Sequence, residues 1–243
     1  MLLPFAASVL AGAIAAVSGF GIGSLLTPLL VLSIPMPTAQ AVAVLAVPHA
    51  VATAIRFVRL RGDVHAPTFR EFGVASAVGG LAGALLQSQL SSPILTAVLS
   101  ALLVIAGTTE LLRRRVPLPQ TSAWRLAGGV LSGAFGGLVG NQGGIRAAAL
   151  LGFQLRPRQL VATATASALL VDAARVPVYF VTAGGVIARS VPLLLVMSAG
   201  VTLGTFIGVP LLGRIPEAAY RRLVGGLLIV LAVSLFTLAL RGT

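Results

Sequence analysis

The sequence predicts an all-α protein, a polytopic membrane bundle of eight to ten helices that forms one transmembrane domain over residues 1–243. Hydrophobic residues make up 57% of the chain and charged residues 9%, against roughly 25% charged residues in a soluble domain. The hydrophobic residues form long continuous runs, unlike the alternating pattern of a barrel strand, so the spans are expected to be helices. Two of these runs are interrupted by glycine-rich polar segments, which predict broken or re-entrant helices.

The first half begins with an apolar run at 2–32. This run is too long for one untilted span of about 20 residues and too short for two. Glycines at positions 19, 21 and 23 divide it, so we expect a pair of short helices here. Full spans are then expected at 38–57, 72–90 and 93–112.

The second half repeats this plan. An apolar run at 126–155 is interrupted by the segment Gly-Asn-Gln-Gly-Gly-Ile-Arg at 140–146. Full spans are expected at 159–181, 191–212 and 223–240, joined by loops at 182–189 and 213–222.

Matching landmarks in the two halves keep nearly one spacing, which indicates a duplication. The pairs and their offsets are Gly19 and Gly140 (121), Pro37 and Pro157 (120), Arg56 and Arg175 (119), and the Gly-x-x-x-Gly segments that begin at Gly79 and Gly204 (125). We therefore predict two internal repeats, at 1–115 and 124–243.

The arginines predict the orientation. All 17 basic residues are Arg, and they account for the net charge of +12. Clustering between apolar runs is typical of cytoplasmic loops and does not indicate a nucleic-acid partner. Four loops on one side carry four, four, two and three Arg, thirteen of the 17; they lie at 56–70, 113–125, 156–158 and 214–222. Both termini are then external, each half crosses three or five times, and the two repeats are inverted.

The two glycine-rich breaks are the candidate solute site, because broken segments at matching positions of inverted halves mark a transport site near the bilayer midplane. Backbone N–H groups at such breaks lack intrahelical partners, and helix N-termini favour an anion. The candidate binding residues are Gly19, Gly21, Gly23, Ser24, Asn141, Gln142, Gly143, Gly144 and Arg146.

Arg146 needs compensation, since a charge at the membrane centre costs at least about 2.5–3.5 kcal/mol. A carboxylate, an anionic ligand or water could supply it, or the side chain could reach the membrane interface.

Titratable residues inside the spans are candidates for coupling or gating. Asp172 is the acidic residue of a predicted span, and Arg175 lies three residues later on the same helix face. The pair could be a structural ion pair, or it could couple transport to protons or gate the site. His49 is a second candidate, with a packing role as the alternative. The hydroxyls of Thr163, Thr165 and Ser167 could bind a solute or the preceding turn of their own helix.

Other chemistries find no support in the sequence. The chain has two His and no Cys, so no metal site is expected. The glycine spacing at 19–23 does not fit a dinucleotide fingerprint, and a phosphate-binding P-loop needs a Lys that the chain lacks. We expect neither a cofactor nor an enzyme.

The segments at 19–29 and 140–144, with Arg156-Pro157 and the Ala-Thr-Ala-Thr-Ala-Ser run at 162–167, resemble the two signature copies of the TauE/SafE sulfite-exporter family. The resemblance covers nearly the whole chain. Ile22, Ser24 and the Asn141-Gln142 pair depart from the family's more consecutive glycines, and Ala149 stands where Pro28 stands in the first copy. The resemblance implies transport of small sulfur-containing anions, such as sulfite or organosulfonates, across a prokaryotic inner membrane.

The sequence thus predicts a secondary transporter for a small anion, in which the two halves rock around the site to give alternating access. The alternatives are an anion channel and an accessory membrane subunit without its own solute. The expected partners are the solute and the lipid bilayer; a homodimer is a candidate, and the oligomeric state stays open.

Overall fold

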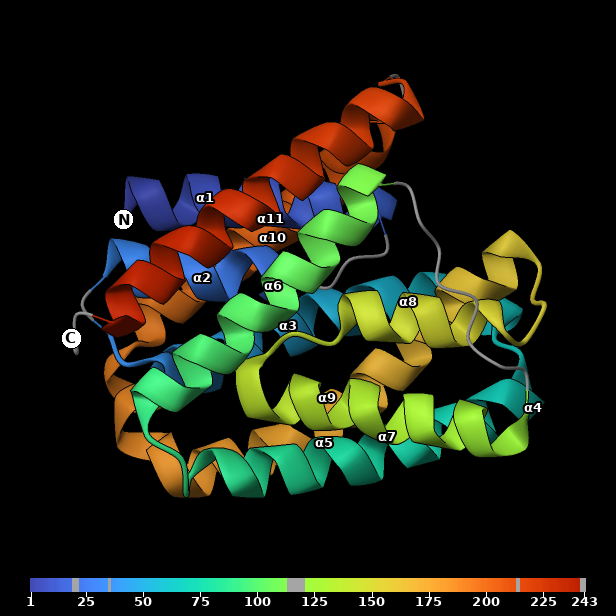
Figure 1. Ribbon diagram of the computed structural model, residues 1–243, viewed down its shortest axis with the longest axis horizontal. Helices are drawn as coiled ribbons and strands as arrows, with labels where there is room; N and C mark the ends of the chain where they lie inside the picture. Colours follow the sequence, from blue (N-terminus) through green and yellow to red (C-terminus); the bar gives the residue numbers. More distant parts are fainter. Residues whose placement is uncertain (19–21, 35, 113–120, 213–214, 241–243) are drawn as a thin grey trace.

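The computed structural model describes residues 1–243 except 19–21, 35, 113–120, 213–214 and 241–243, and the described residues form helices and no strand (Figure 1). The first half contains α1 (Leu2–Ser18), α2 (Gly23–Ser33), α3 (Thr38–Leu60), α4 (Ala66–Thr68), α5 (Val74–Gln87) and α6 (Ser92–Leu112), with a 3-10 turn at Arg61–Asp63 and a π-helical stretch at Phe69–Gly73. The second half contains α7 (Ser122–Val139), α8 (Gly143–Leu151), α9 (Pro157–Arg189), α10 (Val191–Leu212) and α11 (Glu217–Leu240). The prediction of an all-α bundle is confirmed.

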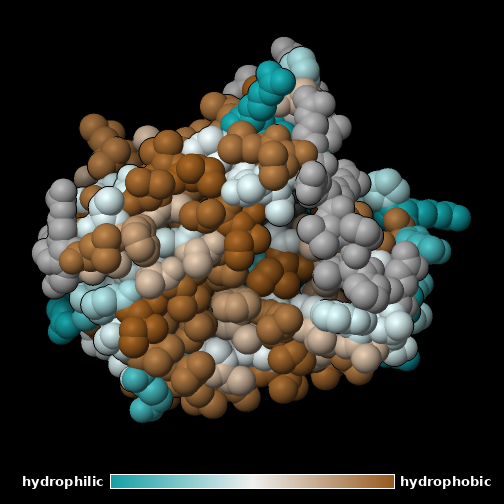
Figure 2. Space-filling model, in the orientation of Figure 1, coloured by the Kyte–Doolittle hydropathy of each residue, from teal (hydrophilic) through white to brown (hydrophobic). Residues whose placement is uncertain are grey.

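Six helices among the described residues are long and apolar enough to cross a membrane, and three of them lie in each half. They are Thr38–Asp63, Ala66–Gln87, Ser92–Leu112, Pro157–Arg189, Val191–Gly208 and Ala218–Leu240. Apolar side chains cover most of the face seen in Figure 2, with hydrophilic residues mainly at its edges. Such a surface suits lipid, and the chain is a multi-pass membrane protein.

The two predicted breaks separate α1 from α2 and α7 from α8. Helix α2 has 11 residues and α8 has nine, which correspond to lengths of about 17 and 14 Å. Each is about half the thickness of the hydrocarbon core. In Figure 1, α1 enters from the left and α2 returns to the left, whereas α7 enters from the right and α8 returns to the right. Each pair therefore dips into the bundle from one end.

The predicted loop at 182–189 is wrong. Helix α9 runs to Arg189, with non-helical dihedral angles only at Ala183 (φ −135°, ψ 19°). The Gly184-Gly185 pair suggested a loop, but Ile187 beyond it is buried in the core. Tertiary packing here outweighs the low helix propensity of glycine. Helix α11 also begins earlier than predicted, at Glu217 rather than 223.

Each of the most closely packed helix pairs combines one helix from the first half with one from the second half. Helix α1 packs along α10, and α5 packs along α7, while α3 pairs with α9 and α6 with α11. A duplicated unit whose copies pair about a two-fold axis gives this arrangement, because each contact between the halves then occurs twice.

Individual glycine contacts recur in the same way. A β-carbon on Gly79 or Gly83 of α5 would collide with the carbonyl of Val130 or Ala134 of α7. A β-carbon on Gly204 or Gly208 of α10 would collide with the backbone of Val9 or Ala13 of α1. Val9 and Val130, like Ala13 and Ala134, are 121 residues apart, the offset of the two breaks. We propose on this basis that the halves are inverted repeats joined by equivalent small-residue interfaces.

Substituting Gly83→Ala or Gly208→Ala should destabilise the protein to a similar extent, by about 1–3 kcal/mol, because each added methyl group meets backbone that cannot move aside. The measurement is the melting temperature of the purified protein in detergent. Gly226→Ala is the matched control, since a β-carbon there meets no atom within 4 Å. A Gly83→Ala variant as stable as the control would contradict this account of the interface.

Candidate functional site

The two breaks meet inside the bundle, where Ser24 contacts Asn141, 117 residues further along the chain. The Ser24 hydroxyl donates a 2.8 Å hydrogen bond to Asn141 Oδ1, and both side chains are buried. A β-carbon on Gly23 would collide with the Gly140 carbonyl oxygen, so only glycine permits this backbone approach. Gly140 itself ends α7 in the left-handed region, at φ +72°.

The N-termini of α2 and α8 lie at this meeting point. The residues that precede them, Ile22 and Gln142, provide no side-chain cap. First-turn N–H groups without a cap need another acceptor. The two helices run from the middle of the bundle towards opposite ends (Figure 1), so their positive dipole ends both lie near the breaks.

Several buried polar atoms around the breaks have no hydrogen-bond partner among the residues that the structure describes. They are Thr27 Oγ1, Asn141 Nδ2, Gln142 Nε2 and Arg146 Nε. Arg146 Nη2 donates to Gln142 Oε1, so the amide oxygen of Gln142 is used and its NH₂ group is the free end. Buried polar groups are normally paired. This cluster consists of three N–H donors and one hydroxyl, which together match the acceptor oxygens of an anion.

Arg146 is buried, with 5% of its surface exposed, so its guanidinium does not reach an interface. It is absent from the ion pairs of the described residues, which are His49–Asp172, Arg158–Asp63, Arg175–Asp172 and Arg221–Glu110. The sequence left open whether a carboxylate, an anionic ligand or water compensates the charge of Arg146. Among the described residues, no carboxylate pairs with it. An anionic ligand or water remains.

Asp172 is the centre of a second buried group, which joins α3 to α9. Its Oδ2 lies 2.7 Å from His49 Nδ1. Its Oδ1 accepts from Arg175 Nε at 2.9 Å and lies 2.8 Å from Arg175 Nη2. All three side chains are nearly inaccessible. The predicted ion pair on one helix face is present, and His49 extends it across the two halves of the chain.

The same face of α9 binds the end of α7. Arg175 Nη1 donates to the Gly136 carbonyl, and the Tyr179 hydroxyl donates to the Gly137 carbonyl. Both carbonyls belong to the last turn of α7, where a helix leaves acceptors unpaired and where cations are favoured. These two side chains therefore hold the α7 end of the break in place.

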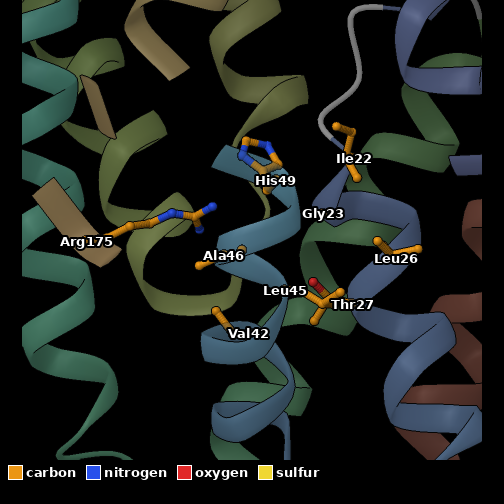
Figure 3. Close-up of a pocket in the computed structure, with 10 residues that line it drawn as sticks. Ile22, Gly23, Leu26, Thr27, Val42, Leu45, Ala46, His49 and Arg175 are labelled. Atoms are coloured by element: carbon orange, nitrogen blue, oxygen red, sulfur yellow. The ribbon is translucent and has the colours of Figure 1, made fainter. Parts of the chain in front are cut away.

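A small pocket, large enough for about one water molecule, lies between the breaks and the Asp172 group. Its polar lining comes from Thr27 of α2, His49 of α3, Gly140 at the break and Arg175 of α9. Figure 3 shows the Arg175 side chain pointing towards α3 beside Ala46 and His49, with Gly23 and Thr27 on the other side of that helix. Arg146 does not line this pocket.

The remaining candidates fall outside this group. Thr165 and Ser167 donate to carbonyls one turn earlier in α9, and Thr163 accepts from the backbone N–H of His65. Thr165 and Ser167 thus bond the preceding turn of their own helix, which is the structural role that the sequence left open, whereas the Thr163 hydroxyl contacts another segment of the chain. Gly143 and Gly144 form the first turn of α8, whereas Gly19 and Gly21 lie outside the described residues.

Sequence reasoning missed two residues of the site. Thr27 lies one turn after Gly23 on α2, and Tyr179 lies four and seven residues after Arg175 and Asp172 on α9. Helical spacing relates each of them to a residue already singled out, and that spacing was an available signal. No group of three His, Cys, Asp or Glu side chains that could hold a metal ion occurs among the residues described by the structure.

In a comparison with protein families, the family described as "Sulfite exporter TauE/SafE" matches residues 4–235. A search of curated proteins gave no match, and neither did a search of solved structures.

Cysteines at positions 24 and 141 should cross-link, because the side chains they replace are in direct contact. The natural chain has no Cys, so Ser24→Cys with Asn141→Cys introduces the two thiols alone. Mild oxidation in membranes, followed by cleavage at a protease site inserted in the 113–120 segment, should leave the two halves joined. Each single-cysteine variant is a matched control and should separate. Failure of the double variant to cross-link, with oxidant or with a short bifunctional maleimide, would contradict the contact.

Proposed function

Because the chain belongs to the sulfite exporter TauE/SafE family, whose members are membrane transporters, we propose that it is a secondary transporter of a small anion such as sulfite or an organosulfonate. The observation that carries the proposal is the set of unpaired donors at the meeting point of the two breaks. Donors without acceptors in a buried position are costly unless a ligand or water completes them.

The chemistry of these donors suits an oxyanion. Sulfite and sulfonate groups present three oxygens, each able to accept several hydrogen bonds, to donors arranged around them. The unpaired groups belong to Thr27 of α2, to Asn141 and Gln142 in the break after α7, and to Arg146 of α8. The uncapped N-termini of α2 and α8 add backbone N–H groups and positive dipole ends. A cation would find no free carboxylate here, since both oxygens of Asp172 are engaged.

The helix packing supports the proposal of alternating access. The tight pairs α1–α10 and α5–α7 each combine one helix from each half. In our proposal the moving bodies are therefore built around these mixed pairs rather than around the two repeats themselves. The α3–α9 contact, with the His49–Asp172 bond, lies between them and is the proposed place of coupling or gating.

The small size of the pocket favours a carrier over a channel. A conducting pore needs a continuous path, whereas space for about one water molecule fits an occluded state. Saturable exchange of labelled for unlabelled solute across vesicles would indicate a carrier, and large ohmic currents would indicate a channel. An accessory subunit would have no reason to keep unpaired donors buried.

We propose the inner membrane of a prokaryotic cell as the location, with both termini external. In Figure 1 the two termini lie at the left end, and the arginine-bearing α3–α4 and α8–α9 connections lie at the right end. Arg158 and Asp63 pair across these two connections. The bias of arginine towards cytoplasmic loops supports this orientation.

Replacement of Arg146 by Ala should lower the affinity for sulfite about 10- to 100-fold, because a hydrogen bond to a charged group contributes about 1.5–3 kcal/mol. The measurement is the concentration dependence of radiolabelled sulfite uptake into proteoliposomes. Arg158→Ala is the matched control, since its side chain is 74% exposed and paired at the surface. Elution as a single monodisperse peak establishes that the variant is folded. Unchanged sulfite affinity in folded Arg146→Ala would remove this residue from the site.

A further inference from the structure

Arg175 lines the pocket, but its guanidinium is already occupied by the protein. Nε and Nη2 both contact Asp172 Oδ1, and Nη1 donates to the Gly136 carbonyl. The carboxylate of Asp172 therefore stands where an anionic solute would bind Arg175. Arg146 differs, because no carboxylate of the described residues pairs with it.

The charges of Arg146, Arg175, Asp172 and His49 determine when Arg175 is free to bind an anion. Arg146 and Arg175 contribute two positive charges and Asp172 one negative charge, with His49 neutral. One anion at Arg146 completes the charge balance. Using Arg175 as well requires that Asp172 first lose its negative charge, because two anions facing one guanidinium in a low-dielectric site repel each other.

We propose that the His49–Asp172 pair binds one proton together with the solute, and that this proton frees Arg175 from Asp172 to bind the anion. The proposal rests on the proposed function and names the coupled ion. In the first step His49 accepts a proton from the pocket at Nε2. The proton at His49 Nδ1 then passes to Asp172 Oδ2 along the 2.7 Å hydrogen bond.

The products of this step are a neutral imidazole with its proton at Nε2 and a neutral carboxylic acid. The acid holds Arg175 less strongly than the carboxylate did. The Nε–H and Nη2–H groups of Arg175 can then donate to a solute oxygen. Release of the solute reverses the transfer, so one proton and one solute molecule cross together and none is consumed.

The surroundings of the pair allow this relay. His49 lines the pocket, so its ring can exchange protons there. The other polar groups around it are the Thr53 hydroxyl, 3.4 Å from Nδ1, the two arginines 146 and 175, and Tyr179, whose hydroxyl donates to Gly137. None of these is a second carboxylate that would take the proton instead.

The placement also explains how a proton could act on the whole protein. His49 belongs to α3 in the first half, and Asp172 and Arg175 belong to α9 in the second. Protonation therefore changes the contact between the two helices that lie between the mixed pairs, and a change in that contact biases any motion of one body against the other.

The test uses methanesulfonate, which stays ionised over the accessible pH range and so carries no proton itself. Proteoliposomes containing a lumenal pH dye report the protons moved for each labelled methanesulfonate. We expect wild type to acidify the lumen in proportion to uptake. Asp172→Asn should lose this proton movement down to the level of protein-free vesicles. Asp63→Asn, which removes a half-buried carboxylate outside the site, should keep the wild-type ratio.

An infrared difference spectrum gives a second readout that does not need transport. Addition of methanesulfonate to wild type and to Asp63→Asn should produce the carbonyl band of a protonated carboxylic acid, and Asp172→Asn should lack it. If methanesulfonate binds and is transported by wild type without protons or without this band, the proton proposal fails and the transporter function stands. If wild type neither binds nor transports methanesulfonate, organosulfonates are excluded as the solute and the proton proposal fails with them; the sulfite uptake measurement then decides separately whether the transporter function stands.

Discussion

Interrupted helices inside a bilayer must have their backbone groups covered, because lipid offers no hydrogen-bonding partners. In this protein the two interrupted segments pack against each other. Gly23 and Gly140 bring their backbones together, and Ser24 bonds Asn141. The coverage is unequal, however. The last-turn carbonyls of α7 receive Arg175 and Tyr179, whereas the first turns of α2 and α8 receive no side-chain cap. These carbonyl acceptors of α7 thus have side-chain partners whereas donors at the breaks do not, and the proposal of an anionic solute rests on this difference.

Charge in the buried site is arranged in the same unequal way. Arg175 has a carboxylate, a carbonyl and a neighbouring imidazole around it, and its charge is largely balanced. Among the described residues, Arg146 has the amide oxygen of Gln142 as its hydrogen-bond partner and no ion pair. A buried guanidinium without a counter-ion is stable only if something else compensates it. The two arginines therefore have different proposed roles: one binds the solute whenever it is present, and the other becomes available when Asp172 is neutral.

The helix packing connects this site to motion. The α1–α10 and α5–α7 interfaces are lined by glycines that allow direct backbone contact, and interfaces of this kind pack closely. Because each of them joins the two halves, neither half can move as a unit without separating a tight pair. This is why the rocking bodies proposed above mix the repeats, which differs from a simple motion of one half against the other.

The sequence by itself determined the class of the protein. Long apolar runs with few charges specify membrane helices, because a run of about 20 apolar residues can span the bilayer and its backbone groups must pair within the helix. It also determined where the helices break, since glycine and polar residues cluster at 19–24 and 140–146, and it indicated the pairing of Asp172 with Arg175 through their spacing on one helix. The misplaced loop at 182–189 shows the limit of such local signals, because packing of Ile187 kept that segment helical.

Only the tertiary structure decided which of these residues meet. The contacts of His49 with Asp172, of Ser24 with Asn141 and of Tyr179 with Gly137 join residues that are 42 to 123 positions apart in the sequence. Thr27 also enters the site only through the packing of α2. No periodicity or composition encodes such contacts, because they arise when the glycine-lined helix faces pack and bring separate segments together. The structure also decided that Arg146 has no carboxylate partner among the described residues, since the position of a charge relative to its counter-ion is a property of the packed bundle.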